Sequence, residues 1–477
     1  MSAGVPRVGE LPRRALVIAA AAAAAGALAV TAPLAGIALA LLCLVAVLLG
    51  PLPLPRIAWV AVLLTAVAAI AGPNLALPAA PWLFAFRILI VLLGLGVVGY
   101  LLLDGRLVLP AGLSRPAALV GAWVLWSALS IGWAEDAVAA ARWTLFLAMM
   151  GGLALAVGMV GANRRRMVTL LWVLGAVFAV ALLIALTEIA TGVRLPTSAL
   201  LGRSRDTAFA ATSLFGNQNN FATYLTLTLP YFLTLPVVFR DVRLRTVGLL
   251  GTGAALVALL YTGSKSNLLA AGLILIGLLV VLGADRRTRG RLVAAAGIAI
   301  LAILLVVPSI RGGGVIPLPE RAVTKFDFGL LGAQREAATG SGAVRSSLLE
   351  DGLELVRRTD GLGVGAGNAE VRVRALANFP GVANLHNWWL EVLVNGGFVG
   401  FALYLTLFLT LLRGQLRIAR GSGDRLLRYL GLSGGLALLG FVAGSLGPST
   451  AIHFAPMWIT FGLGLGTLAL ARREAAR

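Results

Sequence analysis

The chain has 477 residues, of which 59% are apolar and only 12% are charged, and its net charge is +20 at pH 7. Soluble domains have roughly 45–50% apolar and about 25% charged residues, so this composition excludes an ordinary soluble protein and indicates a membrane protein with many spans. The single cysteine, Cys43, excludes a disulfide framework and a thiolate metal site. The two histidines, His386 and His453, are too few to predict a protein-ligated zinc centre, so no metal or cofactor is expected.

Apolar stretches bounded by charged residues, proline or glycine predict fourteen candidate helices, because a bilayer requires about 17–25 apolar residues per span. The first stretch is not predicted to be a signal peptide, since a second apolar run follows it without a polar segment between them. The expected limits are 15–30, 33–50, 57–72, 82–103, 116–132, 140–160, 167–190, 211–236, 247–262, 266–283, 292–309, 388–412, 427–446 and 454–471.

The basic residues are divided unevenly between the two sides of these spans. With a cytoplasmic N-terminus, the inner segments hold 24 of the 39 Lys and Arg residues, whereas the short outer segments hold 5. Positive charge in short loops favours the cytoplasm, so both termini are expected there. One outer segment is about 78 residues long. The predicted parts are therefore a transmembrane bundle over 1–309, an extracytoplasmic loop over 310–387 and C-terminal transmembrane helices over 388–477.

The long outer loop contains a predicted helix over residues 341–359, which carries Arg345 and is expected to lie on the outer face of the bundle. A glycine-rich turn follows it, and we do not interpret this turn as a dinucleotide-binding loop because no strand precedes it. The apolar residues at helical spacing are Leu348, Leu349, Leu353 and Val356, and the glycines are Gly361, Gly363, Gly365 and Gly367.

Several polar residues stand at the predicted outer ends of apolar spans. Arg203 and Arg205 lie in a short outer loop, where guanidinium groups suit a phosphate or pyrophosphate; a solvated loop that contacts lipid head groups is the alternative. Asn217, Asn219 and Asn220 begin the next span, and helix capping explains only one of three amides that are costly in a membrane. Lys265 lies in another predicted outer turn, where its positive charge could also bind an anion. A lysine that snorkels to the membrane surface is the alternative interpretation.

The string from His386 to Glu391 lies where the long loop re-enters the membrane. On a helix that begins here, Asn387 and Glu391 share a face, and two tryptophans suit the interfacial belt. Histidine takes up a proton near neutral pH, and a nearby carboxylate could orient it, so His386 is a candidate base. A polar anchor at the membrane boundary is the alternative interpretation. His453 lacks such neighbours and is expected to be structural.

Four strings in this order resemble the O-antigen ligase and polysaccharide polymerase family of bacterial membrane proteins. Gly216-Asn217-Gln218-Asn219 resembles the family's Gly-Asn-Pro-Asn segment, and Thr262-Gly263-Ser264-Lys265 resembles its Thr-Gly-Ser-Arg segment. Arg345 followed by the glycine turn is similar to the family's loop segment, in which an arginine precedes a Gly-Val-Gly turn. The last string, His386-Asn387-Trp388-Trp389-Leu390-Glu391, is similar to its His-Asn-x-x-Leu-Glu string. Gln218 and Lys265 depart from the family's proline and arginine. The resemblance covers about two-fifths of the chain, from Arg203 to Gly400.

The resemblance implies an all-α polytopic membrane protein of the GT-C-like type, with about 12–14 transmembrane helices and one large extracytoplasmic loop that contains helices. It implies a metal-independent, inverting glycosyltransferase of the bacterial inner membrane, which uses a glycan on a polyprenyl (undecaprenyl) pyrophosphate in the outer leaflet. The acceptor would be a hydroxyl of a glycolipid, cell-wall polymer or glycan, and no nucleic acid is involved.

Carried over by position, His386 would activate the acceptor hydroxyl, while Arg345 and Lys265 would bind and stabilise the departing pyrophosphate. This agrees with the chemistry, which requires a proton acceptor at the attacking oxygen and positive charge beside the leaving group. The expected substrate-binding residues are Arg203, Arg205, Asn217, Asn219, Asn387 and Glu391.

Two other functions remain open at this stage. A polymerase would join lipid-linked repeat units instead of transferring one chain, and the same strings suit both reactions. A lipid-linked oligosaccharide flippase would also have many spans and cavity arginines. Transporters often have repeated halves, whereas this sequence shows no internal repeat and its long outer loop occurs once, so transfer is favoured. A structural scaffold would leave Arg345, Lys265 and His386 without a purpose.

Overall fold

The computed structural model describes residues 54–77, 80–104, 108–201, 210–281, 341–376, 384–448 and 452–476. Eleven of the fourteen predicted spans fall on these residues. The spans predicted at 15–30, 33–50 and 292–309 lie outside the described residues, as do Arg203 and Arg205.

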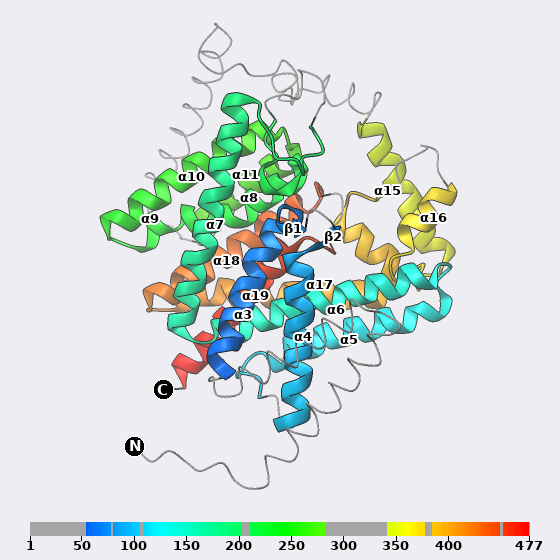
Figure 1. The fold of residues 1–477 in the computed structure, drawn as a ribbon, viewed down its shortest axis with the longest axis horizontal. Helices are drawn as coiled ribbons and strands as arrows, with labels where there is room; N and C mark the ends of the chain where they lie inside the picture. Colours follow the sequence, from blue (N-terminus) through cyan, green and yellow to red (C-terminus); the bar gives the residue numbers. More distant parts are fainter. Residues whose placement is uncertain are drawn as a thin grey trace, which may run out of the picture. The chain divides into compact units, whose positions relative to one another are not determined.

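The described chain is almost wholly helical, and eight of its helical segments are long and apolar enough to cross a membrane. The prediction of an all-α polytopic membrane protein is confirmed. The helices are α3 (Leu54–Ala71), α4 (Ala85–Asp104), α5 (Ser114–Leu129), α6 (Ala137–Gly161), α7 (Arg164–Thr191), α8 (Gln218–Leu233), α9 (Leu235–Val238), α10 (Val242–Thr262), α11 (Lys265–Val281), α15 (Ser341–Arg358), α16 (Ala369–Leu376), α17 (Trp388–Gly421), α18 (Arg425–Gly444) and α19 (Ala455–Ala475) (Figure 1).

Two of the predicted spans begin later than the hydropathy indicated. The start of the 82–103 span is a strand, β2 (Ala80–Phe84), paired antiparallel with β1 (Ala76–Leu77). Prolines at 78 and 81 favour extended backbone in the residues before them, which explains the difference. The start of the 211–236 span is a 3₁₀ turn, η4 (Ser213–Phe215), and a left-handed Gly216 separates it from α8.

The chain divides into two compact units, one made of residues 1–65 and 87–108 and the other of residues 66–86 and 109–477. All the site residues predicted above belong to the second unit. The division predicted at residues 309 and 387 stays a prediction.

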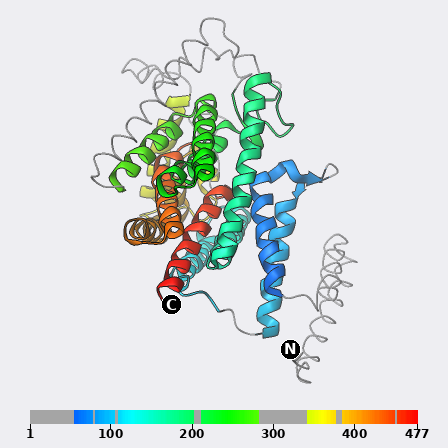
Figure 2. The same ribbon diagram turned by 90° about the vertical axis from the view of Figure 1, so that its left-hand side faces the viewer.

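Helix α18 is the central helix of the second unit. It packs against α8, α11 and α17, while α19 packs along α6 (Figures 1 and 2). Glycines allow these close contacts: a Cβ at Gly431 would lie 2.8 Å from the Gln415 carbonyl oxygen of α17, and one at Gly440 would lie 2.6 Å from Ile274 of α11. The glycines of α18 thus set how closely its neighbours approach.

A cluster of buried aromatic rings joins α5, α17 and α19. The Trp123 ring centroid lies 5.3 Å from Tyr404, 6.0 Å from Trp458 and 6.3 Å from Trp388. All four side chains are fully buried. Large aromatic side chains contribute most to such cores, so this cluster holds the start of α17 firmly to the bundle.

Candidate functional site

Two of the four predicted strings are joined by one buried amide. Asn267, in the first turn of α11, donates from Nδ2 to Thr223 Oγ1 on α8 (3.2 Å) and to Ser264 Oγ (3.0 Å). Its Oδ1 accepts a hydrogen bond from Thr226 Oγ1 (2.9 Å). The turn Thr262–Lys265 and the segment that follows Gly216–Asn219 are therefore held together.

The last turn of α18 brings a third string, His386–Glu391, to the same place. Thr223 Oγ1 donates to the carbonyl oxygen of Gly444 (3.1 Å), and the Trp388 N–H donates to the carbonyl oxygen of Ser445 (3.2 Å). A Cβ at Gly444 would lie 2.9 Å from Asn267 Oδ1, so only glycine allows this approach. The N-terminal ends of α8, α11 and α17 thus meet around one end of α18.

Asn217 is the N-cap of α8. Its Oδ1 accepts from the N–H groups of Asn219 (2.8 Å) and Asn220 (3.4 Å). Capping therefore accounts for one of the three amides, as the sequence indicated. Asn219 lies half-buried in the first turn of the helix.

Glu188 of α7 is a site residue that the sequence analysis did not identify. The carboxylate is buried and accepts hydrogen bonds from the N–H groups of Thr212 (2.7 Å) and Ser213 (2.9 Å) and from Thr212 Oγ1 (3.1 Å). It fixes the turn that leads into Gly216, where Ser213 has a φ of 48°. An acidic residue inside an apolar span was the available signal, because such residues are rare and functional.

Arg194 bonds the same part of the chain as Glu188. It donates from Nη1 to the carbonyl oxygen of Ala210 (2.7 Å), on the far side of the segment that contains Arg203 and Arg205. Burial lowers the pKa of Arg194, and the nearby Glu188 opposes this by raising it. Arginine stays charged even so, and residues 210–213, at the end of the loop, are held by both a cation, Arg194, and an anion, Glu188.

Lys265 is the first residue of α11 and is half-buried, two residues after Gly263, whose φ is 63°. This places its positive charge beside the positive end of the α11 dipole, a combination that favours an anion.

Arg345 lies on α15, the helix predicted over 341–359 and observed at Ser341–Arg358. The first turn of α17 packs against this helix, where a Cβ at Gly352 would lie 2.8 Å from Leu390.

The glycine-rich turn is used for close backbone packing. Gly361, Gly363, Gly365 and Gly367 all have positive φ, as expected for a turn. The Phe398 N–H donates to the Gly361 carbonyl oxygen (2.8 Å), and the Val364 N–H donates to that of Val394 (2.9 Å). The turn is thereby fastened to a break in α17 at Gly397, which the sequence had not predicted within its 388–412 span.

His386 precedes α17 instead of lying on it. Its φ is 50°, and its N–H donates to Asn384 Oδ1 (2.8 Å), while Asn384 Nδ2 donates to Glu370 Oε1 of α16 (3.1 Å). The expectation that a helix begins at His386 is therefore wrong, because the chain turns there and α17 begins only at Trp388, after the Asn387 cap. The left-handed turn and the link to α16 fix the backbone of His386.

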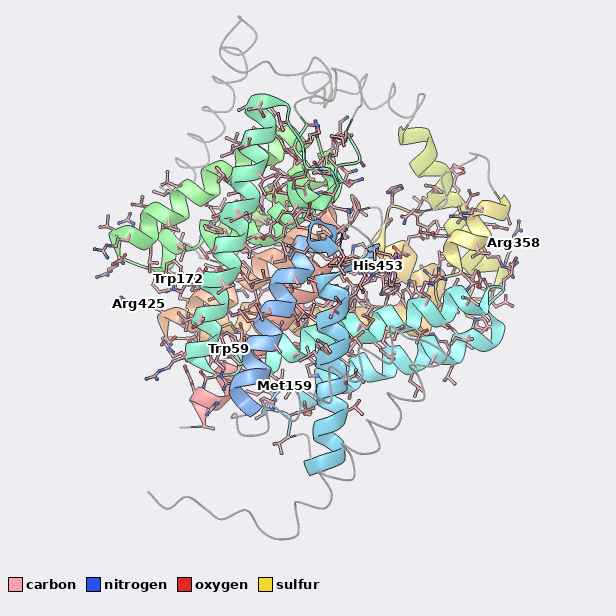
Figure 3. All side chains as sticks on the ribbon, viewed as in Figure 1. Trp59, Met159, Trp172, Arg358, Arg425 and His453 are labelled. Atoms are coloured by element: carbon pink, nitrogen blue, oxygen red, sulfur yellow. The ribbon has the colours of Figure 1, made fainter. Side chains whose placement is uncertain are left out.

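Asn387 is the N-cap of α17, and its Oδ1 accepts from the N–H groups of Trp389 (3.1 Å) and Leu390 (3.3 Å). Glu391 lies in the first turn, where a carboxylate is favoured by the helix dipole. His453, labelled in Figure 3, is separate from these residues in the chain. Its ring contacts Phe146 edge-on, with ring centroids 4.0 Å apart.

An apolar groove of about 630 Å³ lies beside α8. Tyr224 and Thr228 of α8 line it together with Trp172 of α7 and residues of α10, α18 and α19. Tyr224 is seven residues after the Asn217 cap, or about two helical turns. A hydrocarbon chain in this groove would therefore approach the end of α8 where the strings meet.

Residues 250–405 match the model of the O-antigen ligase family. The match contains three of the four strings and the helices α11, α15 and α16; only Gly216–Asn219 lies outside it. This part of the chain is similar to O-antigen ligases. It is also 25% identical over 358 residues to the teichuronic acid biosynthesis protein TuaE of Bacillus subtilis (strain 168), which covers 74% of this chain and 71% of that protein. Both comparisons support a membrane protein of the polysaccharide glycosyltransferase kind, and the resemblance predicted from the strings is confirmed.

Proposed function

We propose that this O-antigen ligase-like protein is a metal-independent, inverting glycosyltransferase at the outer leaflet of the bacterial cytoplasmic membrane. It transfers a glycan from a polyprenyl pyrophosphate carrier to a sugar hydroxyl of a glycolipid, cell-wall polymer or glycan. The observation that carries this proposal is the meeting of three helix N-termini, those of α8, α11 and α17, around the end of α18.

In the proposed reaction the acceptor oxygen attacks the anomeric carbon from the face opposite the pyrophosphate. One carbon–oxygen bond forms as the bond to the pyrophosphate breaks, and the configuration inverts. His386 takes the proton of the acceptor hydroxyl, so that charge does not accumulate on the attacking oxygen. Lys265 and Arg345 stabilise the negative charge of the pyrophosphate as it leaves, which removes the need for a metal ion.

The electrostatics of the converging helices support binding of a pyrophosphate. Each helix N-terminus carries partial positive charge and unsatisfied N–H groups, and Lys265 stands at one of them. Arg203 and Arg205, in the loop anchored by Arg194 and Glu188, are proposed to add further contacts to the same group. Asn217, Asn219, Asn387 and Glu391 are proposed to contact the sugars or to orient the helix ends.

The apolar groove beside α8 supports a lipid-linked donor. Its walls are mostly hydrocarbon and aromatic, which suits part of a polyprenyl chain. A polyprenyl chain held there would present its pyrophosphate near the start of α8. The substrate would therefore span the groove and the converging helix ends.

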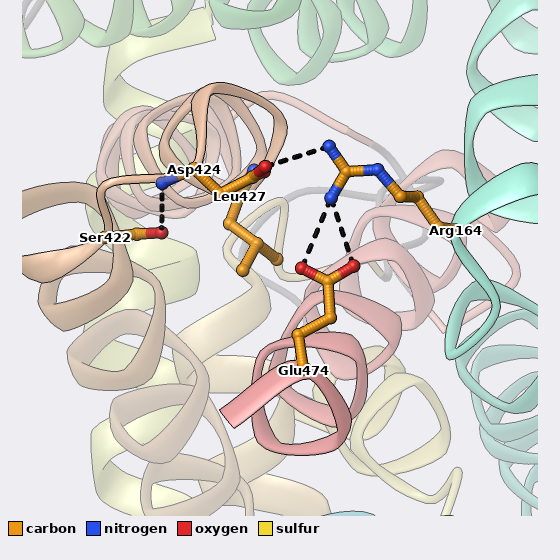
Figure 4. Close-up of polar contacts among 5 residues, drawn as sticks. All are labelled: Arg164, Ser422, Asp424, Leu427 and Glu474. Carbon is orange, nitrogen blue, oxygen red and sulfur yellow. Dashed lines mark hydrogen bonds and ion pairs between the residues drawn. The ribbon is translucent and has the colours of Figure 1, made fainter. Parts of the chain in front are cut away.

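The proposed topology has both termini in the cytoplasm. Three chain segments predicted to be cytoplasmic are joined by Arg164, which bonds Asp424 (2.9 Å) and Glu474 (3.0 Å) (Figure 4). The beginnings of α7 and α18 and the end of α19 therefore lie on one side, as the distribution of arginine requires. This supports the predicted arrangement of spans within the second unit.

The test is transfer of a labelled polyprenyl-pyrophosphate oligosaccharide by the purified protein in detergent with EDTA, with and without an acceptor lipid. We expect product from wild type and His453→Ala and none from His386→Ala. A ladder of lengths without added acceptor would identify a polymerase. If no variant consumes the donor while wild type moves it across liposomes, the protein is a flippase and the proposal is wrong.

A further inference from the structure

A pocket lined by arginines lies far along α17 from the proposed site. It has a volume of about 390 Å³ and is lined by four arginines, Arg115 of α5, Arg413 and Arg417 of α17, and Arg472 of α19. Thr406, where the lining of α17 begins, is about five helical turns from the Asn387 cap. The pocket therefore cannot belong to the cluster that contains His386 and Lys265.

The helix geometry explains why these arginines face one cavity. Residues 406, 409, 410, 413, 414 and 417 recur at intervals of three and four, so they form one stripe on α17. Gln415 is buried on the neighbouring face and donates to the Gly464 carbonyl oxygen (2.8 Å), which fixes α17 against α19. Arg472 packs across Gly112, whose φ is 99°. A Cβ at Gly112 would lie 2.8 Å from Cδ of Arg472.

The positive charge of this pocket is not neutralised by the protein. Within the described part of the chain, none of the four guanidinium groups has a carboxylate at salt-bridge distance. The nearby acids are already engaged, because Asp424 and Glu474 both bind Arg164 (Figure 4). Four like charges around one cavity repel one another, and an anion would relieve that repulsion.

Apart from Thr406 and Thr410, the rest of the lining has no polar side chain, and this apolar wall decides what kind of anion fits. Leu409, Leu468 and Pro116 line the same cavity as the arginines. A free phosphate would leave this apolar wall unused, whereas a phospholipid offers a phosphate and a hydrocarbon chain together. Basic pockets between transmembrane helices are known to suit anionic head groups, and guanidinium binds phosphate through two parallel hydrogen bonds.

We propose that this pocket binds the phosphate-bearing head group of an anionic membrane phospholipid, with the acyl chain along Leu409 and Leu468. Such a lipid would join α5, α17 and α19 at the end of the bundle that the arginine distribution predicts to be cytoplasmic. The proposal does not depend on the glycosyl-transfer reaction, since no residue of the pocket takes part in it.

The test measures the unfolding midpoint of the purified full chain in neutral detergent as each of three probes is titrated. The probes are dihexanoyl phosphatidylglycerol, phosphatidylcholine of the same chain length, and inorganic phosphate. We expect a saturable rise in midpoint with phosphatidylglycerol alone. In the double variant Arg413→Gln/Arg417→Gln its apparent Kd should rise about 30-fold, since each arginine near an anionic head group contributes roughly fivefold.

The matched control is Arg243→Gln/Arg245→Gln, which removes the same charge from two exposed arginines at the start of α10. It should bind phosphatidylglycerol as wild type does. Arg472→Gln is measured separately and should weaken phosphatidylglycerol binding about fivefold. Because Arg472 lies on α19, this variant still tests the pocket if the double variant does not fold. Equal binding by wild type and Arg472→Gln would overturn the proposal. An equal effect of inorganic phosphate would show a site for free anions, and an equal effect of phosphatidylcholine would show that charge is not recognised.

Discussion

At the residue scale, the least regular feature of the proposed site is its lysine. Lys265 stands where the similar family segment has arginine, so it keeps the positive charge but lacks the planar fork that binds two phosphate oxygens. Its position at the α11 N-terminus compensates in part, because the helix N–H groups can supply further hydrogen bonds.

We predict that Lys265→Arg keeps at least about half of the wild-type turnover, whereas Lys265→Ala loses about 100-fold or more, the usual effect of removing one electrostatic contact to a developing charge. The measurement is the initial rate with the labelled polyprenyl-pyrophosphate donor. Ser266→Ala, the next residue of the same turn, is the matched control and should stay near the wild-type rate. Equal turnover by Lys265→Ala and wild type would remove Lys265 from the site.

Sequence reasoning at this scale found the strings but not what joins them. Asn217 was identified as a site residue and a possible cap, and the structure shows the cap. Asn267 and Gly444 were missed, because the first looks like any polar residue in an outer turn and the second like any glycine in an apolar helix. Their importance arises from a contact between segments that are 177 residues apart in the chain. No local pattern encodes that distance.

At the element scale, hydropathy predicted the helices well and their interruptions poorly. The eleven spans that fall on described residues each correspond to observed helix, because burial in lipid or protein requires continuous apolar sequence. The break in α17 at Gly397 was not predicted, since glycine is also common inside regular transmembrane helices. What distinguishes Gly397 is the glycine turn packed against it, and that partner is visible only in the fold.

We predict that Gly397→Ala destabilises the protein by about 2 kcal/mol or more. Its backbone, at φ 62° and ψ −164°, is open almost only to glycine, and such strain typically costs about 1–3 kcal/mol. A Cβ there would also collide with the carbonyl oxygens of Gly361 and Leu362, so the glycine turn must shift. Thermal unfolding in detergent provides the measurement.

The neighbouring Gly396→Ala is the matched control, because a Cβ at Gly396 meets no atom within 4 Å. This change should leave the unfolding midpoint unchanged or raise it slightly, since alanine favours helix over glycine. If the two alanine variants unfold at the same temperature, the packing of the glycine turn against α17 does not limit stability.

At the scale of the whole molecule, charge and packing divide the ends of the helices into two kinds. The starts of α8, α11 and α17 meet through uncharged hydrogen bonds around Asn267, where we propose that the substrate binds. The starts of α7 and α18 and the end of α19 meet through ion pairs to Arg164. This second contact holds three chain segments together at one end of the bundle, and substrate binding is proposed at the other end.

The Arg164 contact gives stability a pH dependence of known sign. Although partial burial favours the neutral acid, the hydrogen bond from Arg164 and the N–H of Leu427 outweigh it, and together they lower the pKa of Asp424 below its ordinary value. A carboxylate with a lowered pKa stabilises the fold at pH values above about 4 and loses that contribution as pH falls further. The pair is partly exposed, so its contribution should be about 0.5 kcal/mol.

Asp424→Asn isolates this contribution, because asparagine caps a helix as well as aspartate does and removes only the charge. We predict a lower unfolding midpoint than wild type at pH 7, with the difference shrinking as pH falls from 5 to 3 and Asp424 takes up its proton. Asp241→Asn is the matched control: Asp241 caps α10 through the Leu244 N–H (3.0 Å), and no described arginine lies within ion-pair distance. A pH-independent difference between wild type and Asp424→Asn would mean that the charge of Asp424, and with it the Arg164 ion pair, is not the source of the difference in stability.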